Sequence, residues 1–378
     1  MSDKLKVYGQ HDHKTLNQMY TCLKTGDAYK GVLCADGHLG YAHPIGGVVA
    51  YKDQISISGV GFDIACGNKA IMLDTRIEDI QHKLPVIAAD IAKTISFGIG
   101  RTNQSKKAPQ FQVKDDLWDE ADCRHLKNMA YSQLGTVGSG NHYVDVFSDQ
   151  QGRIWIGVHF GSRGLGHKLT TKALKDAGGK DGMEVPPTLV DVKSEIGVRY
   201  LAALELAGAY AYQGRDWVVE TVRGIIGGRV LHSVHNHHNW AWREEHNGES
   251  FYVVRKGATP AFPGQEGFVG GSMGDDAVII EGVDSQESRD SLYSTIHGAG
   301  RVMGRNVAKK TLDRKVMEKW LHDKKVIVHG GDLDESPMAY RRLNDVLKEH
   351  EGTIKINHVL SPIIVVMAGG KEVDPYKD

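Results

Sequence analysis

The chain has 378 residues and a formal net charge of −1; 25% of its residues are charged and 40% are hydrophobic. This is the composition of an ordinary globular protein, without the roughly 20-residue apolar run that spans a bilayer, and the near-zero charge gives no support for nucleic-acid binding over the whole surface. Residues 1–6 lack the apolar core of a signal peptide, so we expect a cytoplasmic protein with no membrane partner. No composition shift marks a boundary, and we expect residues 1–378 to form one domain.

The hydrophobic pattern predicts a mixture of strands and helices. Residues 28–70 are typical of short strands separated by glycine turns, and residues 77–96 have apolar side chains at helical spacing, with Pro85 where it would break or restart the helix. Residues 153–159 indicate a buried strand that ends at a histidine, and residues 192–225 indicate the longest helix. Strand-like runs then occur at 251–254, 277–280, 326–329 and 363–366, with helices around 308–322 and 337–350. Because no regular βαβ rhythm appears, we predict an α+β fold with mixed sheets flanked by helices.

Five segments place metal-binding side chains or a nucleophile beside glycine or asparagine. They cover residues 59–67, 138–142, 158–164, 236–239 and 297–301. Asp, Cys and His side chains bind divalent transition metals, and glycine lets backbone and ligand approach closely. The four cysteines contain no CxxC pair, which argues against a zinc ribbon or a disulfide framework. The pattern predicts one polar, metal-centred site built from loops of a single fold.

The candidate metal ligands are Asp63, Cys66, His142, His159 and His238. Alone, the cysteine would be interpreted as an inert buried thiol, and a single histidine at a strand end is more often structural than a ligand. Taken together, the five residues favour metal binding over a structural role. Each histidine also has a polar neighbour that could orient a metal-bound imidazole. The set is too rich for one closed tetrahedral zinc site, so two adjacent divalent cations that share a ligand fit better.

His297 lies in a different setting, the sequence His-Gly-Ala-Gly-Arg. Two glycines expose backbone N–H groups, and Arg301 and Arg305 add guanidinium groups, a combination suited to phosphate oxygens. His297 is therefore a candidate base or nucleophile, with a further metal ligand as the alternative. The sequence contains neither a Walker A loop nor a dinucleotide-binding fingerprint.

With these motifs, the chain resembles the RtcB family of RNA ligases, which act in tRNA splicing and RNA repair. The resemblance runs from residues 43–48 to 361–362 and includes 134–142, 255–259, 271–274, 297–301 and 334–340. It implies an α+β fold specific to the family and two Mn²⁺ ions on the five candidate ligands, with Cys66 bridging. His297 matches the histidine that becomes guanylylated. The positions that match guanylate contacts of the family are Asn141, Asp145, Asn239, Ser272, Ala299 and Gly300.

The resemblance also implies a reaction that depends on GTP and Mn²⁺. His297 would attack the α-phosphorus of GTP and release pyrophosphate. An RNA 2′,3′-cyclic phosphate would be opened to a 3′-phosphate that takes the GMP, and a 5′-hydroxyl RNA end would displace GMP and seal the strand. The alternative is a dinuclear metal-dependent phosphoesterase for cyclic phosphate ends of RNA, in which His297 is a general acid and no nucleotide is needed. A third interpretation is a protein that only binds RNA ends, against which the intact ligand set argues. The sequence identifies no activating protein.

Three departures from the family pattern lie near the expected nucleotide. Ala277 stands where the family has a second serine, and Asp145 stands where it has the longer glutamate. Residues 367–369 are Met-Ala-Gly where the family has a Lys-Gly pair, and the chain then continues through Lys371. Because losing a buried base contact costs about 1–3 kcal/mol, we predict a divergent member, for which another nucleotide than GTP or a damaged-RNA substrate outside tRNA splicing is the alternative. Manganese rests on the resemblance, since thiolate and imidazole bind Zn²⁺ more tightly.

Overall fold

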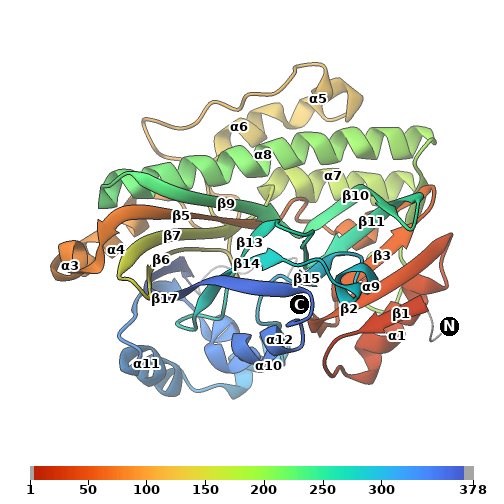
Figure 1. Ribbon diagram of the computed structural model, residues 1–378. Coiled ribbons are helices and arrows are strands. Elements are labelled where there is room, and N and C mark those ends of the chain that lie inside the picture. The colour runs from red at the N-terminus through yellow and green to blue at the C-terminus, as the bar shows by residue number, and fades with distance from the viewer. Residues whose placement is uncertain (1–3, 370–378) are drawn as a thin grey trace.

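The structure is a computed structural model that describes residues 4–369 (Figure 1). Helices and sheets are mixed along the chain, so the predicted α+β class is confirmed. In Figure 1 the larger sheet lies on the left and the smaller sheet on the right, and helix α8 (Glu195–Ile226) runs across the top of both. Within the described residues no helix combines the length and the apolar character needed to cross a bilayer. The assignment of residues 1–378 to one domain stays a prediction.

The larger sheet has eight strands, and most of its neighbouring strands are antiparallel. Seven follow the order β13-β14-β17-β6-β7-β5-β9, and the eighth, β16, pairs with β17 in parallel. The middle strands β6 and β7 are buried along almost their whole length, because the sheet is covered on both faces. The strands are β5 (Gly67–Arg76), β6 (Tyr143–Asp149), β7 (Arg153–Phe160), β9 (Val230–His237), β13 (Glu266–Val269), β14 (Ala277–Gly282), β16 (Ile327–Gly331) and β17 (Ile354–Gly369).

The smaller sheet has five strands in the order β1-β2-β3-β11-β10. They are β1 (Leu5–Val7), β2 (Ala28–His38), β3 (Ile45–Tyr51), β10 (Asn239–His246) and β11 (Glu249–Lys256). Two further strand pairs join β4 (Gln54–Ser56) to β8 (Leu189–Asp191) and β12 (Ala258–Pro260) to β15 (Ser294–Ile296). The chain crosses from the larger to the smaller sheet between β9 and β10, and His238 is the single residue at that crossing. The predicted histidine therefore lies where the two sheets meet.

Helix α8 confirms the long helix predicted for residues 192–225. Ser194 caps it, accepting a hydrogen bond from a backbone N–H of the first turn. Tyr200 and Leu204 in its first half pack in the core that includes part of the smaller sheet, whereas Val218 and Val222 in its second half pack against the larger sheet. The other helices are α1 (His13–Leu23), α2 (Ile57–Val60), α3 (Ile77–Ile80), α4 (Leu84–Thr94), α5 (Leu117–Glu120), α6 (Lys127–Gln133), α7 (Arg163–Asp176), α9 (Gln286–Asp290), α10 (Arg305–Thr311), α11 (Arg314–Asp323) and α12 (Leu343–Lys348).

Two predicted helices are interrupted. The helical segment 77–96 stops at Ile80, passes through a 3-10 turn over Gln81–Lys83, and restarts as α4 with Pro85 in its first turn. Proline is tolerated there because its missing N–H would have no helical partner. The prediction of one helix around 308–322 is wrong in detail, because the chain turns before Asp313, whose side chain caps a second helix.

A buried ion pair holds β10 to β11. Arg255 is fully buried, and its guanidinium donates to both carboxylate oxygens of Glu244, at 2.6 and 3.1 Å, and to the Ser294 hydroxyl at 2.8 Å. Burial alone would raise the pKa of Glu244, but the charge of Arg255 and hydrogen bonds from His246 and Arg255 hold that pKa below its ordinary value of 4.5. Both partners are therefore charged at neutral pH.

We expect Glu244→Gln to lower the free energy of unfolding by about 3–5 kcal/mol at neutral pH, because it leaves a buried guanidinium without its counter-charge. Since the pKa of Glu244 is lower in the folded than in the unfolded protein, its contribution is present above about pH 4.5 and is lost as the pH falls through the folded pKa. The Glu244→Gln variant should therefore not lose this part of its free energy of unfolding as the pH falls. Urea denaturation at neutral and acidic pH measures both effects.

Glu249→Gln, at an exposed ion pair with Lys52, is the control and should change stability by less than about 1 kcal/mol. Equal stability of Glu244→Gln and the wild type at neutral pH would contradict the expectation.

Candidate active site

The five predicted metal ligands meet at one cavity of about 1070 Å³. Asp63 and Cys66 come from the loop between α2 and β5, His142 directly precedes β6, His159 lies near the end of β7, and His238 separates β9 from β10. All five line this cavity. The structure thus brings together side chains that the sequence distributes over four separate segments. Their role as metal ligands stays a prediction.

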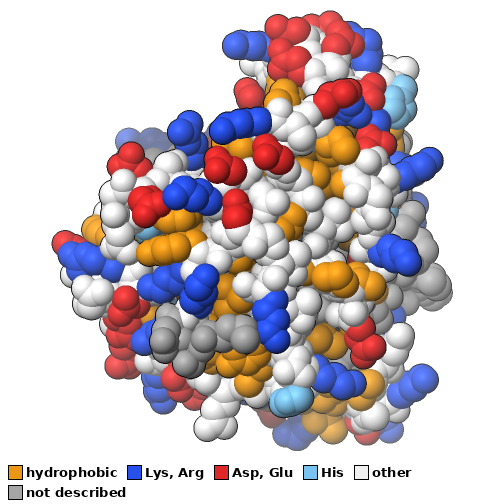
Figure 2. Space-filling view, turned by 90° about the vertical axis from the view of Figure 1, so that its right-hand side faces the viewer, with side chains coloured by type: hydrophobic (Ala, Val, Ile, Leu, Met, Phe, Trp, Pro, Cys, Tyr) orange, Lys and Arg blue, Asp and Glu red, His pale blue; other side chains and the backbone are white. Residues whose placement is uncertain are grey.

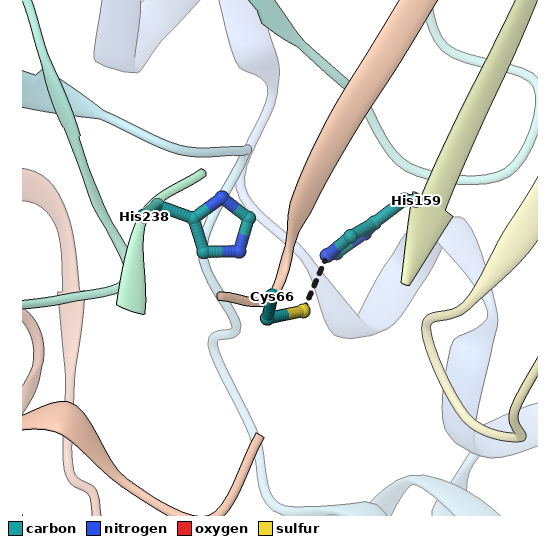
Figure 3. A group of neighbouring side chains, drawn as sticks. All are labelled: Cys66, His159 and His238. Atoms are coloured by element: carbon teal, nitrogen blue, oxygen red, sulfur yellow. Dashed lines mark hydrogen bonds between the residues drawn. The ribbon is translucent and has the colours of Figure 1, made fainter. Parts of the chain in front are cut away.

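Their ligand atoms form two groups that share Cys66. Within residues 4–369, Cys66, His159 and His238 form one group and Asp63, Cys66 and His142 the other, and the ligand atoms of each lie within 4.8 Å of one another. Figure 3 shows the first group converging, with the Cys66 Sγ 3.2 Å from the His159 Nε2. In the second group, the His142 Nε2 lies 3.6 Å from the Cys66 Sγ and 3.1 Å from an Asp63 oxygen. Donors at 2.0–2.3 Å from one cation lie roughly 3–4.5 Å apart, so both groups have spacings near those of a cation site.

Burial sets the protonation of these groups. It lowers the pKa of His159 and of His238 well below 6.5, and neighbouring histidines act in the same direction, so both imidazoles are neutral at pH 7. For Asp63, burial opposes ionisation, but hydrogen bonding and electrostatic attraction to His142 outweigh it and bring the pKa to about 2. Neutral imidazole and ionised carboxylate are the forms that bind metal ions.

A bound cation would change the state of two of these groups. Burial raises the pKa of the Cys66 thiol well above 9.0, and the nearby Asp63 carboxylate raises it further. A divalent cation reverses this effect, because a coordinating thiol loses its proton. The Nδ1 of His238 is buried and has no hydrogen-bond partner among the described residues. The donor set therefore suits a divalent transition metal.

Local backbone geometry holds the loop that carries Asp63 and Cys66. The Cys66 N–H donates to the Asp63 carbonyl at 3.0 Å, and the His238 N–H donates to the Cys66 carbonyl at 2.9 Å. Ala65 has a φ of 54°, which is uncommon for a residue with a side chain. At Gly161 a Cβ would lie 2.3 Å from an Asp63 carboxylate oxygen. Glycine at this position therefore allows the end of β7 to pass beside the carboxylate.

His297 follows β15 and lies next to the cluster. It lines the same cavity, and its ring centroid is 4.8 Å from that of His238. Its Nδ1 lies 2.6 Å from an oxygen of Asp36, which also accepts the backbone N–H groups of His297 at 3.0 Å and of Gly298 at 3.3 Å. Burial would raise the pKa of Asp36, but the charge of His297 and its hydrogen bonds hold it below 3.8. The ionised carboxylate accepts the Nδ1 proton, and in a ring that is protonated on Nδ1 alone the Nε2 keeps its lone pair.

Sequence reasoning missed Asp36, although a signal was present. Asp36 is a fully buried carboxylate that follows the apolar run 32–35 of β2, an unusual position for an acid without a partner. Its partner, His297, is far away in the sequence. Gly300 explains how the two segments approach, because a Cβ there would lie 2.3 Å from the Asp36 carbonyl oxygen. Glycine at this position is therefore a condition for the contact between Asp36 and His297.

The six residues expected at the nucleotide line the same cavity: Asn141, Asp145, Asn239, Ser272, Ala299 and Gly300. Asn239 also has structural contacts, because its amide donates to the Asp63 carbonyl at 3.1 Å and its oxygen accepts the Gly257 N–H at 2.8 Å. Asp145 is buried, and its Oδ1 has no hydrogen-bond partner in the described part of the chain. Burial raises the pKa of Asp145 well above 3.8. A protonated carboxyl group at this wall can both donate and accept hydrogen bonds.

The departures from the family pattern lie in different places. Ala277 is fully buried in β14 and does not line the cavity, whereas Met367 does. Lys371 lies outside the described residues.

Basic side chains contribute to the cavity wall, although the outer surface has mixed charge. Arg163, Lys256, Arg301 and Arg305 line the cavity. Arg255 does not, because it is buried in the ion pair with Glu244. Figure 2 shows one face of the molecule, on which Lys and Arg are interspersed with Asp and Glu. Basic side chains therefore line the cavity together with acidic ones, and Arg301 and Arg305 are paired there with Glu335.

Comparisons with known proteins identify the family of the chain. The family described as "tRNA-splicing ligase RtcB" matches residues 18–368. The chain is 31% identical over 364 residues to the RNA-splicing ligase RtcB of Escherichia coli (strain K12), with 88% of each chain covered. It is 28% identical over 396 residues to the tRNA-splicing ligase RtcB of Archaeoglobus fulgidus, with 82% of each covered. It is also 28% identical over 428 residues to the protein of that name from Thermococcus kodakarensis, covering 90% of this chain and 88% of that one.

Proposed function

Because the chain belongs to the RtcB family and is an RNA ligase, we propose that it joins RNA ends with a 2′,3′-cyclic phosphate or 3′-phosphate to 5′-hydroxyl ends, using GTP and Mn²⁺. The observation that carries this proposal is the cavity in which His297 lies beside two ligand groups that share Cys66. Positioning and charge neutralisation are what phosphoryl transfer chiefly requires. A ligase with this cavity is suited to tRNA splicing or RNA repair.

In this proposal Asp63, Cys66 and His142 would hold one divalent cation, and Cys66, His159 and His238 would hold the other. Bound cations neutralise phosphate oxygens and make the phosphorus more electrophilic. The donor spacings and the unpartnered His238 Nδ1 support two cations with a shared thiolate. The choice of manganese comes from the family.

The first step would be attack by the His297 Nε2 on the α-phosphorus of GTP. A nitrogen–phosphorus bond forms, and the bond from the α-phosphorus to pyrophosphate breaks. The Asp36 carboxylate holds the Nδ1 proton and offsets the positive charge that develops on the ring. Lys256 and Arg301 lie in the cavity wall and would offset phosphate charge, with Arg301 also paired with Glu335. The guanylate would contact Asn141, Asp145, Asn239, Ser272, Ala299 and Gly300.

The later steps regenerate His297. Water opens the cyclic phosphate by breaking its bond to the 2′-oxygen, and an oxygen of the resulting 3′-phosphate displaces His297 from the GMP phosphorus. The 5′-hydroxyl oxygen of the second RNA end then attacks the 3′-phosphorus, loses its proton and expels GMP. The test uses purified protein, Mn²⁺, GTP and an RNA pair with these ends, and it measures sealed RNA and released pyrophosphate. Cyclic-phosphate hydrolysis with neither product would favour the dinuclear phosphoesterase instead.

Asp36→Asn should slow formation of the histidine–GMP adduct by roughly 10²–10⁴-fold, because an amide can donate to Nδ1 and so favour the tautomer that protonates Nε2. The single-turnover rate of label transfer from α-labelled GTP measures this. Mn²⁺ affinity is the internal control and should not change, because Asp36 belongs to neither ligand group. An unchanged adduct rate would remove Asp36 from the mechanism.

GTP should form the adduct in preference to ATP, and Asp145→Ala should reduce this preference by about 5–100-fold if its buried carboxyl group contacts the base. Parallel reactions with α-labelled GTP and ATP measure the ratio. Asn141→Ala is the comparison, and equal weakening of both nucleotides in that variant would place its contact away from the base. Equal labelling of the wild type by ATP and GTP would overturn the proposed nucleotide.

A further inference from the structure

Arg215 is a charged side chain that the mechanism above does not use. It lies on α8, is fully buried and does not line the cavity. In the described residues its hydrogen bonds go to uncharged acceptors: the carbonyl oxygens of Ala65 at 2.9 Å and Phe160 at 2.6 Å, both from Nη1, and the His235 Nε2 at 2.9 Å, from Nε. Burying a charge without a carboxylate partner is costly. Its position therefore calls for an explanation beyond general packing.

The two carbonyl groups flank two candidate metal ligands. Ala65 directly precedes Cys66, and Phe160 directly follows His159. The ladder between β5 and β7 ends at the pair Gly67 and Phe160, so no hydrogen bond of the sheet connects Ala65 to β7. Arg215 makes that connection, and it does so at a residue with a left-handed backbone conformation. One guanidinium nitrogen thus ties the Cys66 loop to the strand end that presents His159.

Neighbouring side chains fix the orientation of Arg215. Because a guanidinium group only donates, the His235 Nε2 must accept, and the His235 proton lies on Nδ1, 3.4 Å from an Asp216 oxygen. The Tyr212 ring lies 4.7 Å from the guanidinium carbon and stacks on the His235 ring at 3.9 Å. Asp216 is in turn paired with Lys69 on β5. These contacts of Arg215, which we call the clamp, therefore extend from the candidate metal centre to α8 and back to the larger sheet.

We infer that Arg215 is a positioning residue of the metal centre, which sets the distance between the Cys66 sulfur and the His159 imidazole through the Ala65 and Phe160 carbonyl groups. The observed separation of 3.2 Å between the Cys66 Sγ and the His159 Nε2 is the geometry that it maintains. This inference rests on the proposed metal centre.

The test is Arg215→Lys, which keeps the charge but cannot reach both carbonyl groups and His235 together. Mn²⁺ binding without nucleotide or RNA should weaken by roughly 10–100-fold, as is typical when a group that orients a ligand is lost. Calorimetry measures the affinity, and Co²⁺ provides a second readout through the absorption of its bond to the Cys66 thiolate. Arg223→Lys is the matched control on the same helix, because Arg223 forms a surface ion pair with Glu220 and should leave binding unchanged.

A double-mutant cycle separates positioning from general destabilisation. If Arg215 acts by orienting Cys66, then Arg215→Lys should cost much less Mn²⁺ affinity in a Cys66→Ser background than in the wild type. Equal losses in the two backgrounds would overturn the inference. If circular dichroism shows that Arg215→Lys does not fold, the His235→Leu variant is tested instead. That variant removes one support of the guanidinium and should weaken Mn²⁺ binding several-fold, and unchanged binding would overturn the clamp.

The remaining outcomes separate the two proposals. If the wild-type protein binds no divalent cation, both the proposed metal centre and the inference about Arg215 are wrong. If the wild type binds Mn²⁺ and Arg215→Lys binds it equally well, only the clamp is wrong.

Discussion

His297→Asn should abolish the acid-labile nucleotide adduct and reduce RNA sealing by roughly four to six orders of magnitude, as expected when a covalent nucleophile is removed. The structural reason is the pairing of its Nδ1 with Asp36, which leaves the Nε2 available for attack. Incubation with α-labelled GTP and Mn²⁺, followed by denaturing electrophoresis, measures the adduct. His167→Asn is the matched control, because it changes another histidine of the cavity wall that belongs to neither ligand group and is not paired with Asp36.

A second substrate tests whether His297 acts only in the nucleotide steps. RNA that already carries GMP on its 3′-phosphate bypasses adduct formation, so His297→Asn should seal it at a rate close to that of the wild type. Failure to seal this RNA in a folded variant would show that His297 has a further role. An adduct that forms in His297→Asn as in the wild type would exclude it as the nucleophile.

Cys66→Ala should disrupt both cation sites at once, because Cys66 is the residue common to the two ligand groups. We expect affinity for Mn²⁺ to fall by at least about 10–100-fold and ligation to be lost. His142→Ala, by contrast, should weaken only the group that contains Asp63. Calorimetry gives the number of ions bound and their affinities, and loss of the cobalt–thiolate absorption reports on Cys66 itself.

The control for this experiment is Cys123→Ala. Cys123 is also buried, but it does not line the cavity, so its replacement should leave metal binding unchanged. A Cys66→Ala protein that still binds two Mn²⁺ ions with wild-type affinity would exclude the shared thiolate. Selective loss of one ion would assign Cys66 to a single site.

The parts of the fold that could be predicted are those that depend on the sequence pattern of short segments. The strand that carries His159 near its end, the long helix α8 and the restart of a helix at Pro85 depend on side-chain periodicity and on proline geometry, which are properties of short segments. The single helix predicted near 308–322 was wrong because the cap formed by Asp313 competes with the apolar periodicity. The sheet order was not predictable, since pairs such as β5 with β9 and β3 with β11 join segments that are remote in the sequence.

The sequence by itself determined the candidate donors, because Asp63, Cys66, three histidines and His297 are recognisable from their chemistry and their settings rich in glycine or asparagine. Only the tertiary structure decided that these donors form two groups with Cys66 in both, since that depends on distances between separate segments. It also revealed Asp36 behind His297 and Arg215 behind the Cys66 loop. Neither lies in a motif, because the contacts of each are set by a strand or helix packed against the site from elsewhere in the chain.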